Sequence, residues 1–179
     1  MRLAPLLAVA LAFAPVAGWA ALAPGAKAPD FTTRGALGGK IFTLKLSDQL
    51  KNGPVVLYFF PAAFTPGCTL EAREFAEATA EFRKVGATVI GMSADPVDKL
   101  ADFSVKECAS KFAVASAGPR VIEGYDVKLP QKEGLTNRTS YVIAPDGRIV
   151  YAHSDMNPRE HVKNTLAAVR EWRAAGSRP

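Results

Sequence analysis

The middle of the chain switches between two hydrophobic patterns. Residues 55–60 are an unbroken run of β-branched, leucine and aromatic side chains, which is typical of a strand covered on both faces. Between residues 68 and 85 the apolar positions recur at intervals of three and four instead, and this spacing predicts a helix with one face on a core. The positions that define this face are Phe75, Ala78, Phe82 and Val85.

The same two patterns recur after Gly86. Residues 87–93 predict a second buried strand, and residues 96–112 predict a second helix. The spacing of four, three and four predicts that one face of this helix carries Ala101, Val105, Cys108 and Phe112. Because a helix separates the two strands in the chain, the strands are predicted to be parallel and joined by a crossover connection.

Turn residues mark two hairpins. Gly38-Gly39 predicts a hairpin within residues 31–46, and Pro145-Asp146-Gly147 predicts another between the apolar segments 140–144 and 148–152. Such a second hairpin adds antiparallel strands to the parallel pair.

Two further helices complete the pattern. Residues 120–125 predict a short helix, and Asn157-Pro158 predicts the start of the last helix, with a capping side chain followed by proline. The buried face of this last helix is predicted to carry Val162, Leu166, Val169 and Trp172. The order of elements predicts an α/β chain with a thioredoxin-like fold, in which a central mixed β-sheet is flanked by helices.

Residues 1–20 have the composition of a secretory signal peptide. Arg2 is followed by a long apolar stretch that closes with small residues, and Pro5 and Pro15 interrupt it in a way that disfavours a membrane-spanning helix. We therefore predict cleavage after Ala20, a periplasmic or otherwise exported protein without stable membrane insertion, and a single domain in residues 21–179. An uncleaved membrane anchor is the alternative.

Charge and histidine content argue against two classes of function. The formal net charge is +5, and 22 basic residues are scattered among 17 acidic ones, whereas nucleic-acid binding calls for a basic stripe. A metal site needs clustered ligands. The only two histidines, His153 and His161, lie far along the chain from the cysteines and are expected at a strand end and on a helix surface, so we expect no metal and no cofactor.

Cys68 lies where the first core strand gives way to a helix. Thr65-Pro66 resembles a cap followed by proline at the first helical position, which places Cys68 in the first turn. There the unpaired N–H groups and the positive end of the helix dipole favour a thiolate, the nucleophilic form of a thiol. From the residues alone, two alternatives stay open: passive packing of Cys68 in the helix, and a static disulfide with Cys108.

The segment before Cys68 resembles a known family. Residues 61–68, PAAFTPGC, match the peroxiredoxin pattern P-x-x-x-T-x-x-C, and residues 64–69 resemble the peroxiredoxin Q or bacterioferritin-comigratory-protein subfamily in particular. Arg138, directly before residues 139–143, is similar to that family's R-[TS]-x-[FY]-V-I segment. The resemblance extends from about residue 25 to residue 169. One departure is Ala62-Ala63, where many relatives have a polar residue.

The resemblance implies a thiol-dependent peroxidase and a role for each matching position. Cys68 would be the thiolate that attacks the terminal peroxide oxygen and becomes a sulfenic acid. Arg138 would favour the thiolate and hold the substrate oxygens, while Thr65 would position the peroxide. Pro61 would shield the sulfur from water, and Glu71 would orient Arg138. Without the motif, Pro61 is only a strand stop, Glu71 a favourable acid in a first helical turn, and Arg138 a surface residue.

Cys108 is the second candidate thiol. Some members of the subfamily carry their second cysteine five residues after the first, where this chain has Arg73. Others carry it on the next helix, and the resemblance implies that Cys108 resolves the sulfenic acid by forming an intramolecular disulfide with Cys68. Since a disulfide needs Cα atoms within about 7 Å, local unfolding is an expected step. The alternative is a buried structural thiol.

The resemblance also implies the partners. These are hydrogen peroxide or a small alkyl hydroperoxide, and a thioredoxin-like thiol reductant, with the chain acting as a monomer or weak dimer in antioxidant defence. A disulfide reductase on the same fold would carry C-x-x-C, but the fourth position here is Glu71. A metal-delivery protein would need clustered Cys and His ligands, and a binding module without catalysis would not need the complete motif.

Overall fold

The computed structural model describes residues 21–176. The predicted signal peptide, residues 1–20, lies outside the described residues. Within the described part of the chain, no helix is both long enough and apolar enough to cross a membrane.

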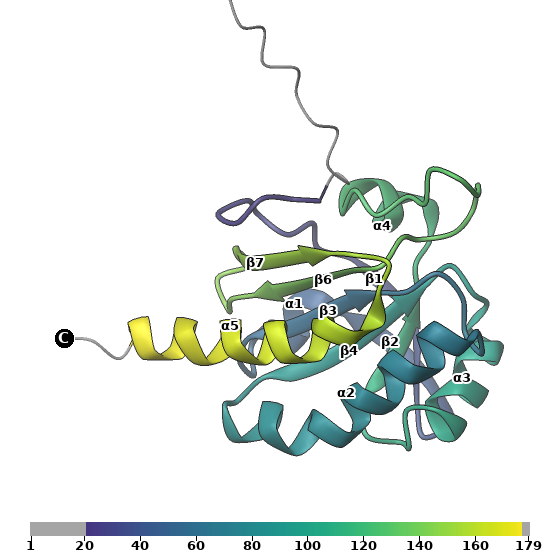
Figure 1. Ribbon diagram of the computed structural model, residues 1–179, viewed down its shortest axis with the longest axis horizontal. Helices are drawn as coiled ribbons and strands as arrows, with labels where there is room; N and C mark the ends of the chain where they lie inside the picture. Colours follow the sequence, from purple (N-terminus) through teal and green to yellow (C-terminus); the bar gives the residue numbers. More distant parts are fainter. Residues whose placement is uncertain (1–20, 177–179) are drawn as a thin grey trace, which may run out of the picture.

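A mixed sheet forms the centre of the molecule (Figure 1). Its seven strands are β1 (Thr32–Leu37), β2 (Lys40–Lys45), β3 (Val55–Phe59), β4 (Thr88–Ser93), β5 (Ala113–Ser116), β6 (Thr139–Ile143) and β7 (Ile149–Ser154), in the spatial order β2-β1-β5-β4-β3-β6-β7. β3 is parallel to β4 and β4 is parallel to β5, whereas the other neighbours are antiparallel. This arrangement confirms the predicted mixed sheet, including both hairpins.

Helices cover both faces of the sheet. They are α1 (Leu46–Leu50), α2 (Pro66–Lys84), α3 (Val97–Lys106), α4 (Pro119–Gly124) and α5 (His161–Gly176), the last preceded by a 3-10 turn at Pro158–Glu160. Apolar residues of α2, α3 and α5 share one core cluster with the sheet, and those of α1 and α4 share the other. Figure 1 shows α2 and α5 in front of the sheet.

β3 lies between these two cores. Leu57 and Phe59 contribute to the cluster under α1 and α4, while Val56 and Tyr58 contribute to the one under α2, α3 and α5. All five residues of the strand are fully buried, which explains why its sequence is apolar without alternation. The strand is therefore a rigid base for the loop that follows it and leads to Cys68.

The prediction of a helix over residues 96–112 is wrong for residues 107–112. α3 ends at Lys106, and the chain then turns through Ala109 and Ser110, whose φ angles of 48° and 56° are left-handed. Phe112 leads into β5, a strand that the sequence analysis did not predict, and Val105 of the supposed buried face is exposed. The small residues of this four-residue strand show no period of their own, because their burial comes from β1 and β4 on either side.

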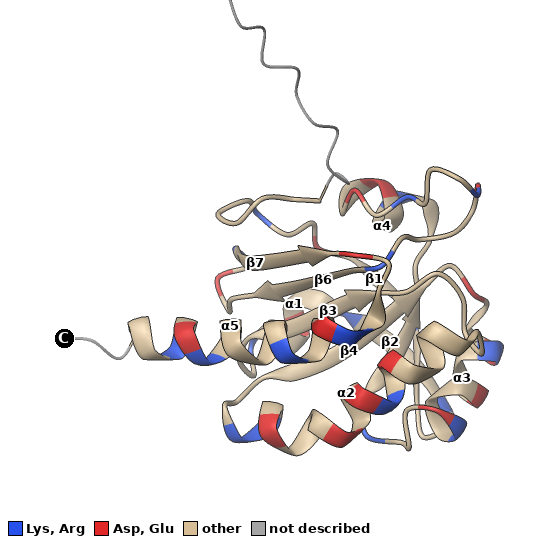
Figure 2. Ribbon diagram, viewed as in Figure 1, with Lys and Arg blue, Asp and Glu red and all other residues tan. Residues whose placement is uncertain are grey.

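The surface carries charges of both signs. Acidic and basic residues are interspersed along α2 and α5 (Figure 2), and one pair, Arg170 with Glu81 at 3.1 Å, joins the two helices. This is the mixed, solvated surface that the composition predicts.

Candidate active site

Cys68 is the third residue of α2, in the helix's first turn. Thr65 occupies the N-cap position and Pro66 the first helical position, as predicted. The hydroxyl of Thr65, however, donates to the carbonyl oxygen of Ala62 at 2.9 Å and makes no capping hydrogen bond to the helix. The Thr65 side chain therefore leaves the N–H groups of this first turn uncapped, and Cys68 within the turn is 1% exposed.

The loop from Pro61 to Thr65 is fixed from several sides. Asp95, which follows β4, accepts a hydrogen bond from the backbone N–H of Ala63 at 2.7 Å. Phe64 has a left-handed φ of 68°, and its ring packs edge-on against Phe103 of α3. A non-glycine residue keeps such a conformation only where the surroundings hold it, so this loop is preorganised. Asp95 was not identified from the sequence, because its role depends on a contact across 32 residues.

Arg138 contacts Cys68 although the two residues are 70 positions apart in the sequence. Its backbone directly precedes β6, and its Nη2 donates to the Cys68 sulfur at 3.4 Å while its Nε donates to the carbonyl oxygen of Met156 at 3.0 Å. A Cβ atom on Gly67 would lie 3.2 Å from the same Nη2, which is closer than ordinary van der Waals contact, so glycine leaves room for the guanidinium. The structure thus brings Arg138 and Cys68 together, and Arg138 is a buried residue rather than a surface one.

Glu71 lies behind Arg138 and is completely buried. Its Oε2 accepts a hydrogen bond from Arg138 Nη1, which is the contact expected of a carboxyl group that orients the guanidinium. Burial lowers the pKa of Arg138, but the attraction of Glu71 and then of Cys68 outweighs it, so the pKa is raised above its usual value. Burial also raises the pKa of Glu71 to about 8, against the opposing effect of Arg138.

The prediction that His161 lies on a helix surface is wrong. His161 is the first residue of α5 and is completely buried. Its Nδ1 lies 2.8 Å from the hydroxyl of Ser140 and 3.7 Å from Glu71 Oε1. The predicted buried face of α5 was apolar, whereas the actual one also contains His161 and Thr165, four residues apart. That polar pair at helical spacing was the available signal in the sequence.

Cys108 is not on a helix, in contrast to the prediction. It follows α3 in the turn that leads to β5, where its N–H donates to the carbonyl oxygen of Phe103 at 3.2 Å. Both cysteines are free thiols, and both are buried in the core cluster under α2, α3 and α5. Burial, and secondarily Glu107, raises the pKa of the Cys108 thiol. A static disulfide between them is absent from this structure.

Two side chains of α2 bind the turn around Cys108, one through a salt bridge and one through a hydrogen bond. Arg73 forms a salt bridge with Glu107, with Nη2 and Oε2 2.8 Å apart, and Arg83 donates to the carbonyl oxygen of Lys111 at 3.0 Å. Arg73 is the position at which some relatives carry their second cysteine. In this chain the same position contacts the neighbour of Cys108 instead.

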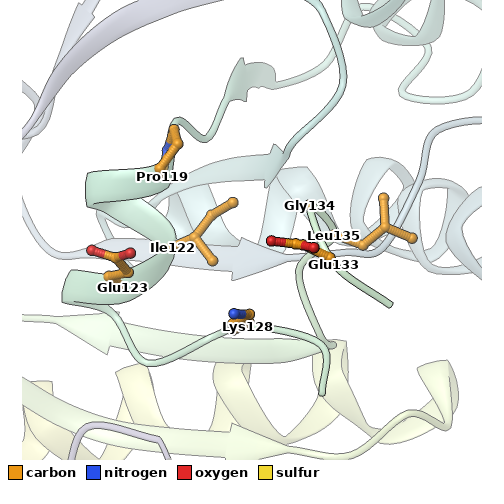
Figure 3. A pocket seen from close by; sticks show the side chains of 7 residues that line it. All are labelled: Pro119, Ile122, Glu123, Lys128, Glu133, Gly134 and Leu135. Carbon is orange, nitrogen blue, oxygen red and sulfur yellow. The ribbon is translucent and has the colours of Figure 1, made fainter. Parts of the chain in front are cut away.

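A separate hollow of about 180 Å³ lies between α4 and the segment that follows it. Figure 3 shows Ile122 and Leu135 lining it together with the charged side chains of Glu123, Lys128 and Glu133. No candidate site residue lines this hollow, so the chemistry of Cys68 does not take place there.

The chain is similar to several known proteins. Residues 24–152 match the model of the AhpC/TSA family. The chain is 32% identical over 152 residues to peroxiredoxin Bcp of Bacillus subtilis, covering 82% of this chain and 94% of that protein. It is 33% identical over 143 residues to the chloroplastic peroxiredoxin Q of rice, Oryza sativa subsp. japonica, covering 79% of this chain and 64% of the rice protein. The chain thus spans less than two thirds of the rice protein's length.

A solved structure shows the same architecture. The crystal structure of peroxidoxin BcpB from Mycobacterium tuberculosis superposes with a TM-score of 0.74 at 33% sequence identity, covering 83% of this chain and 96% of that one. The sequence motifs, the sheet and these relatives all indicate the same family. The chain therefore belongs to the AhpC/TSA family, among the peroxiredoxins of the Q and Bcp type.

Proposed function

We propose that this chain is a thiol peroxidase that reduces hydrogen peroxide and small alkyl hydroperoxides through Cys68. The observation that carries the proposal is the 3.4 Å hydrogen bond from Arg138 to the Cys68 sulfur in the first turn of α2. A fixed guanidinium and the helix dipole both favour a thiolate over a thiol. The same guanidinium has planar donors that suit the two oxygens of a peroxide.

In the first step the Cys68 thiolate attacks the terminal oxygen of the peroxide. A sulfur–oxygen bond forms, the O–O bond breaks, and the departing oxygen takes up a proton and leaves as water or an alcohol. Cys68 is thereby oxidised to a sulfenic acid. Arg138 stabilises the negative charge that moves from sulfur to the departing oxygen. The Thr65 hydroxyl uses its hydrogen on Ala62 and keeps lone pairs that can accept the peroxide O–H.

In the second step the Cys108 thiol condenses with the sulfenic acid, forming a disulfide and releasing water. A dithiol reductant of the thioredoxin-like type then reduces the disulfide and is itself oxidised. Cys68 belongs to the first turn of α2 and Cys108 to the turn after α3, so these two segments open in order to bring the sulfurs within bonding distance. The left-handed residues Ala109 and Ser110 beside Cys108 favour this opening, since such conformations cost of order 1 kcal/mol each.

The proposal also covers the cellular location of the protein. The apolar segment before Ala21 supports export and cleavage after Ala20, and an exported enzyme needs a reductant in the same compartment. We propose a chain that acts as a monomer or weak dimer there. Sequencing the N-terminus of the protein recovered from an expressing bacterium tests the cleavage: a first residue of Ala21 supports it, and a retained Met1 contradicts it.

Stopped-flow oxidation of the reduced protein by hydrogen peroxide tests the activity. Fast, peroxide-dependent consumption that disappears in Cys68→Ser, with a product linking Cys68 to Cys108 in mass spectra, supports the whole cycle. Slow oxidation that is indifferent to peroxide concentration contradicts it. Cys108→Ser separates the two steps, because it should keep the first turnover and lose sustained turnover with the dithiol reductant.

A further inference from the structure

The buried acid behind Arg138 has an incomplete set of partners. Arg138 contacts Oε2 of Glu71, but Oε1 has no hydrogen-bond partner among the described residues. A buried carboxylate oxygen without a donor is costly, and structures rarely keep one. The nearest ionisable atom recorded beside this oxygen is Nδ1 of His161, at 3.7 Å.

The hydrogen bonds of His161 determine where its proton lies. Its Nε2 is 2.9 Å from the carbonyl oxygen of Asp155, which can only accept, so Nε2 carries a hydrogen. Nδ1 is therefore the nitrogen that gains or loses a proton, and it faces Ser140 at 2.8 Å and Glu71 at 3.7 Å. Across 3.7 Å the two atoms are not hydrogen-bonded in this structure, but one proton on the pair gives the unpartnered oxygen a favourable electrostatic partner.

We propose that Glu71 and His161 share one proton behind Arg138, and that this shared proton makes Cys68 ionise. With the proton on the pair, Glu71 and His161 together are neutral, and Arg138 is the uncompensated charge of the buried site. A thiolate on Cys68 then restores neutrality, since a buried net charge is unfavourable. Without the shared proton, Glu71 alone neutralises Arg138, and the thiolate adds a second buried negative charge.

The surrounding charges are compatible with this sharing. Burial raises the pKa of Glu71 to about 8 and lowers the pKa of His161 to about 4, so at neutral pH one proton is held within the pair, mainly on the carboxyl. The other ionisable side chains that interact with the pair are Arg138 before β6, His153 on β7 with its ring 4.6 Å from that of His161, Asp155 after β7, Glu74 on α2, and Tyr58 on β3, whose pKa Glu71 helps to raise. Through Glu71 and Arg138, His161 is a positioning residue for the reaction.

The inference rests on the proposed role of Cys68, and the pH titration of its thiolate tests it separately from turnover. The thiolate absorbs near 240 nm, and the spectrum of Cys68→Ser supplies the baseline. His161→Leu removes the nitrogen, while His161→Asn keeps a polar atom near Nδ1 that cannot take up a proton. Both substitutions should raise the midpoint of the Cys68 titration by one pH unit or more, which is a tenfold loss of thiolate below the midpoint.

A second background identifies the cause of the shift. In Glu71→Gln, residue 71 is neutral whether or not His161 is present. The midpoint of the Cys68 titration in the double variant Glu71→Gln with His161→Asn should therefore equal the midpoint in Glu71→Gln alone. Thr165→Val is the matched control, since Thr165 is buried on the same helix and donates only to backbone oxygens of α5; its midpoint should equal that of the unmodified chain. Two results would overturn the proposal of a shared proton. One is a normal midpoint in His161→Asn, and the other is an equal shift from His161→Asn in the unmodified chain and in Glu71→Gln.

The unmodified protein offers a test that does not depend on the folding of variants. In NMR spectra of ¹³C- and ¹⁵N-labelled protein, the Glu71 carboxyl carbon and His161 Nδ1 should change together at one pH. An ionised Glu71 beside a neutral His161 at pH 7 overturns the inference. If these titrations behave as expected while peroxide is not consumed in a Cys68-dependent way, the proposed function fails and the shared proton stands.

Discussion

The turn around Cys108 provides a quantitative test of the opening step. Arg73 and Glu107 are paired across 2.8 Å, with the Arg73 side chain 62% exposed and that of Glu107 14% exposed. A pair open to solvent on one side is worth about 0.5–1 kcal/mol. Arg73→Ala removes this salt bridge and so destabilises only the closed form of the turn, because the salt bridge is already broken in the opened form.

A loss of about 0.5–1 kcal/mol raises the equilibrium population of the opened turn about 2- to 5-fold, since 1.4 kcal/mol corresponds to a factor of ten. If opening precedes disulfide formation, Arg73→Ala should accelerate the formation of the Cys68 to Cys108 bond by the same factor. Its rate of reaction with peroxide should not rise, because Arg73 does not contact the site around Cys68 in the structure.

The assay is a quenched time course after one equivalent of peroxide, in which mass spectrometry follows the sulfenic acid and the disulfide separately. Arg170→Ala is a suitable control, because Arg170, 52% exposed, forms a salt bridge from α5 to Glu81, also on α2, and away from Cys108. An unchanged or slower disulfide step in Arg73→Ala, or an equal acceleration in Arg170→Ala, would refute the reasoning that the salt bridge of Arg73 restrains Cys108.

Three further measurements follow from the geometry. Gly67→Ala puts a Cβ 3.2 Å from Arg138 Nη2 and should lower the rate constant with hydrogen peroxide about tenfold; a normal rate would show that the guanidinium tolerates the methyl group. Tyr58→Phe removes a buried hydroxyl that has no hydrogen-bond partner in the described part of the chain, so the free energy of unfolding in urea should rise by about 1 kcal/mol. A loss of stability would indicate a hidden partner. Because burial raises the pKa of Cys108 in the folded chain, its ionisation favours the unfolded chain, and stability should fall as the pH rises above about 8.5. Iodoacetamide should accordingly label Cys108 slowly at pH 9 without urea and quickly with it, and equal rates would contradict this.

The parts of the site that were correctly predicted are local in sequence. An apolar run, a proline and a helical repeat place Cys68 in the first turn of α2, because capping and helix geometry depend on residues within one or two turns. The motif that ends at Cys68 identified the family for the same reason, since its residues are contiguous. Arg138 was predicted from a second short motif, and its distance from Cys68 could not be known from either segment alone.

Long-range pairing decided the rest. The antiparallel register of β3 and β6 sets Phe59 opposite Thr139, and this places Arg138 beside the loop that leads to Cys68. The burial of His161 depends on how α5 packs against β6 and β7, and neither the polar pair His161 and Thr165 nor any neighbouring residue identifies Glu71 as its partner. The end of α3 before Cys108 was missed because β5 gains its stability from strands far away in the chain.

The sequence by itself therefore determined that Cys68 begins a helix after a buried strand. It also determined the family, because local geometry and contiguous motifs are written in neighbouring residues. Only the tertiary structure decided the charge environment of Cys68 and the position of Cys108. The physical reason is that a pKa or a hydrogen bond in a buried site depends on which side chains the sheet brings together and how completely they exclude water.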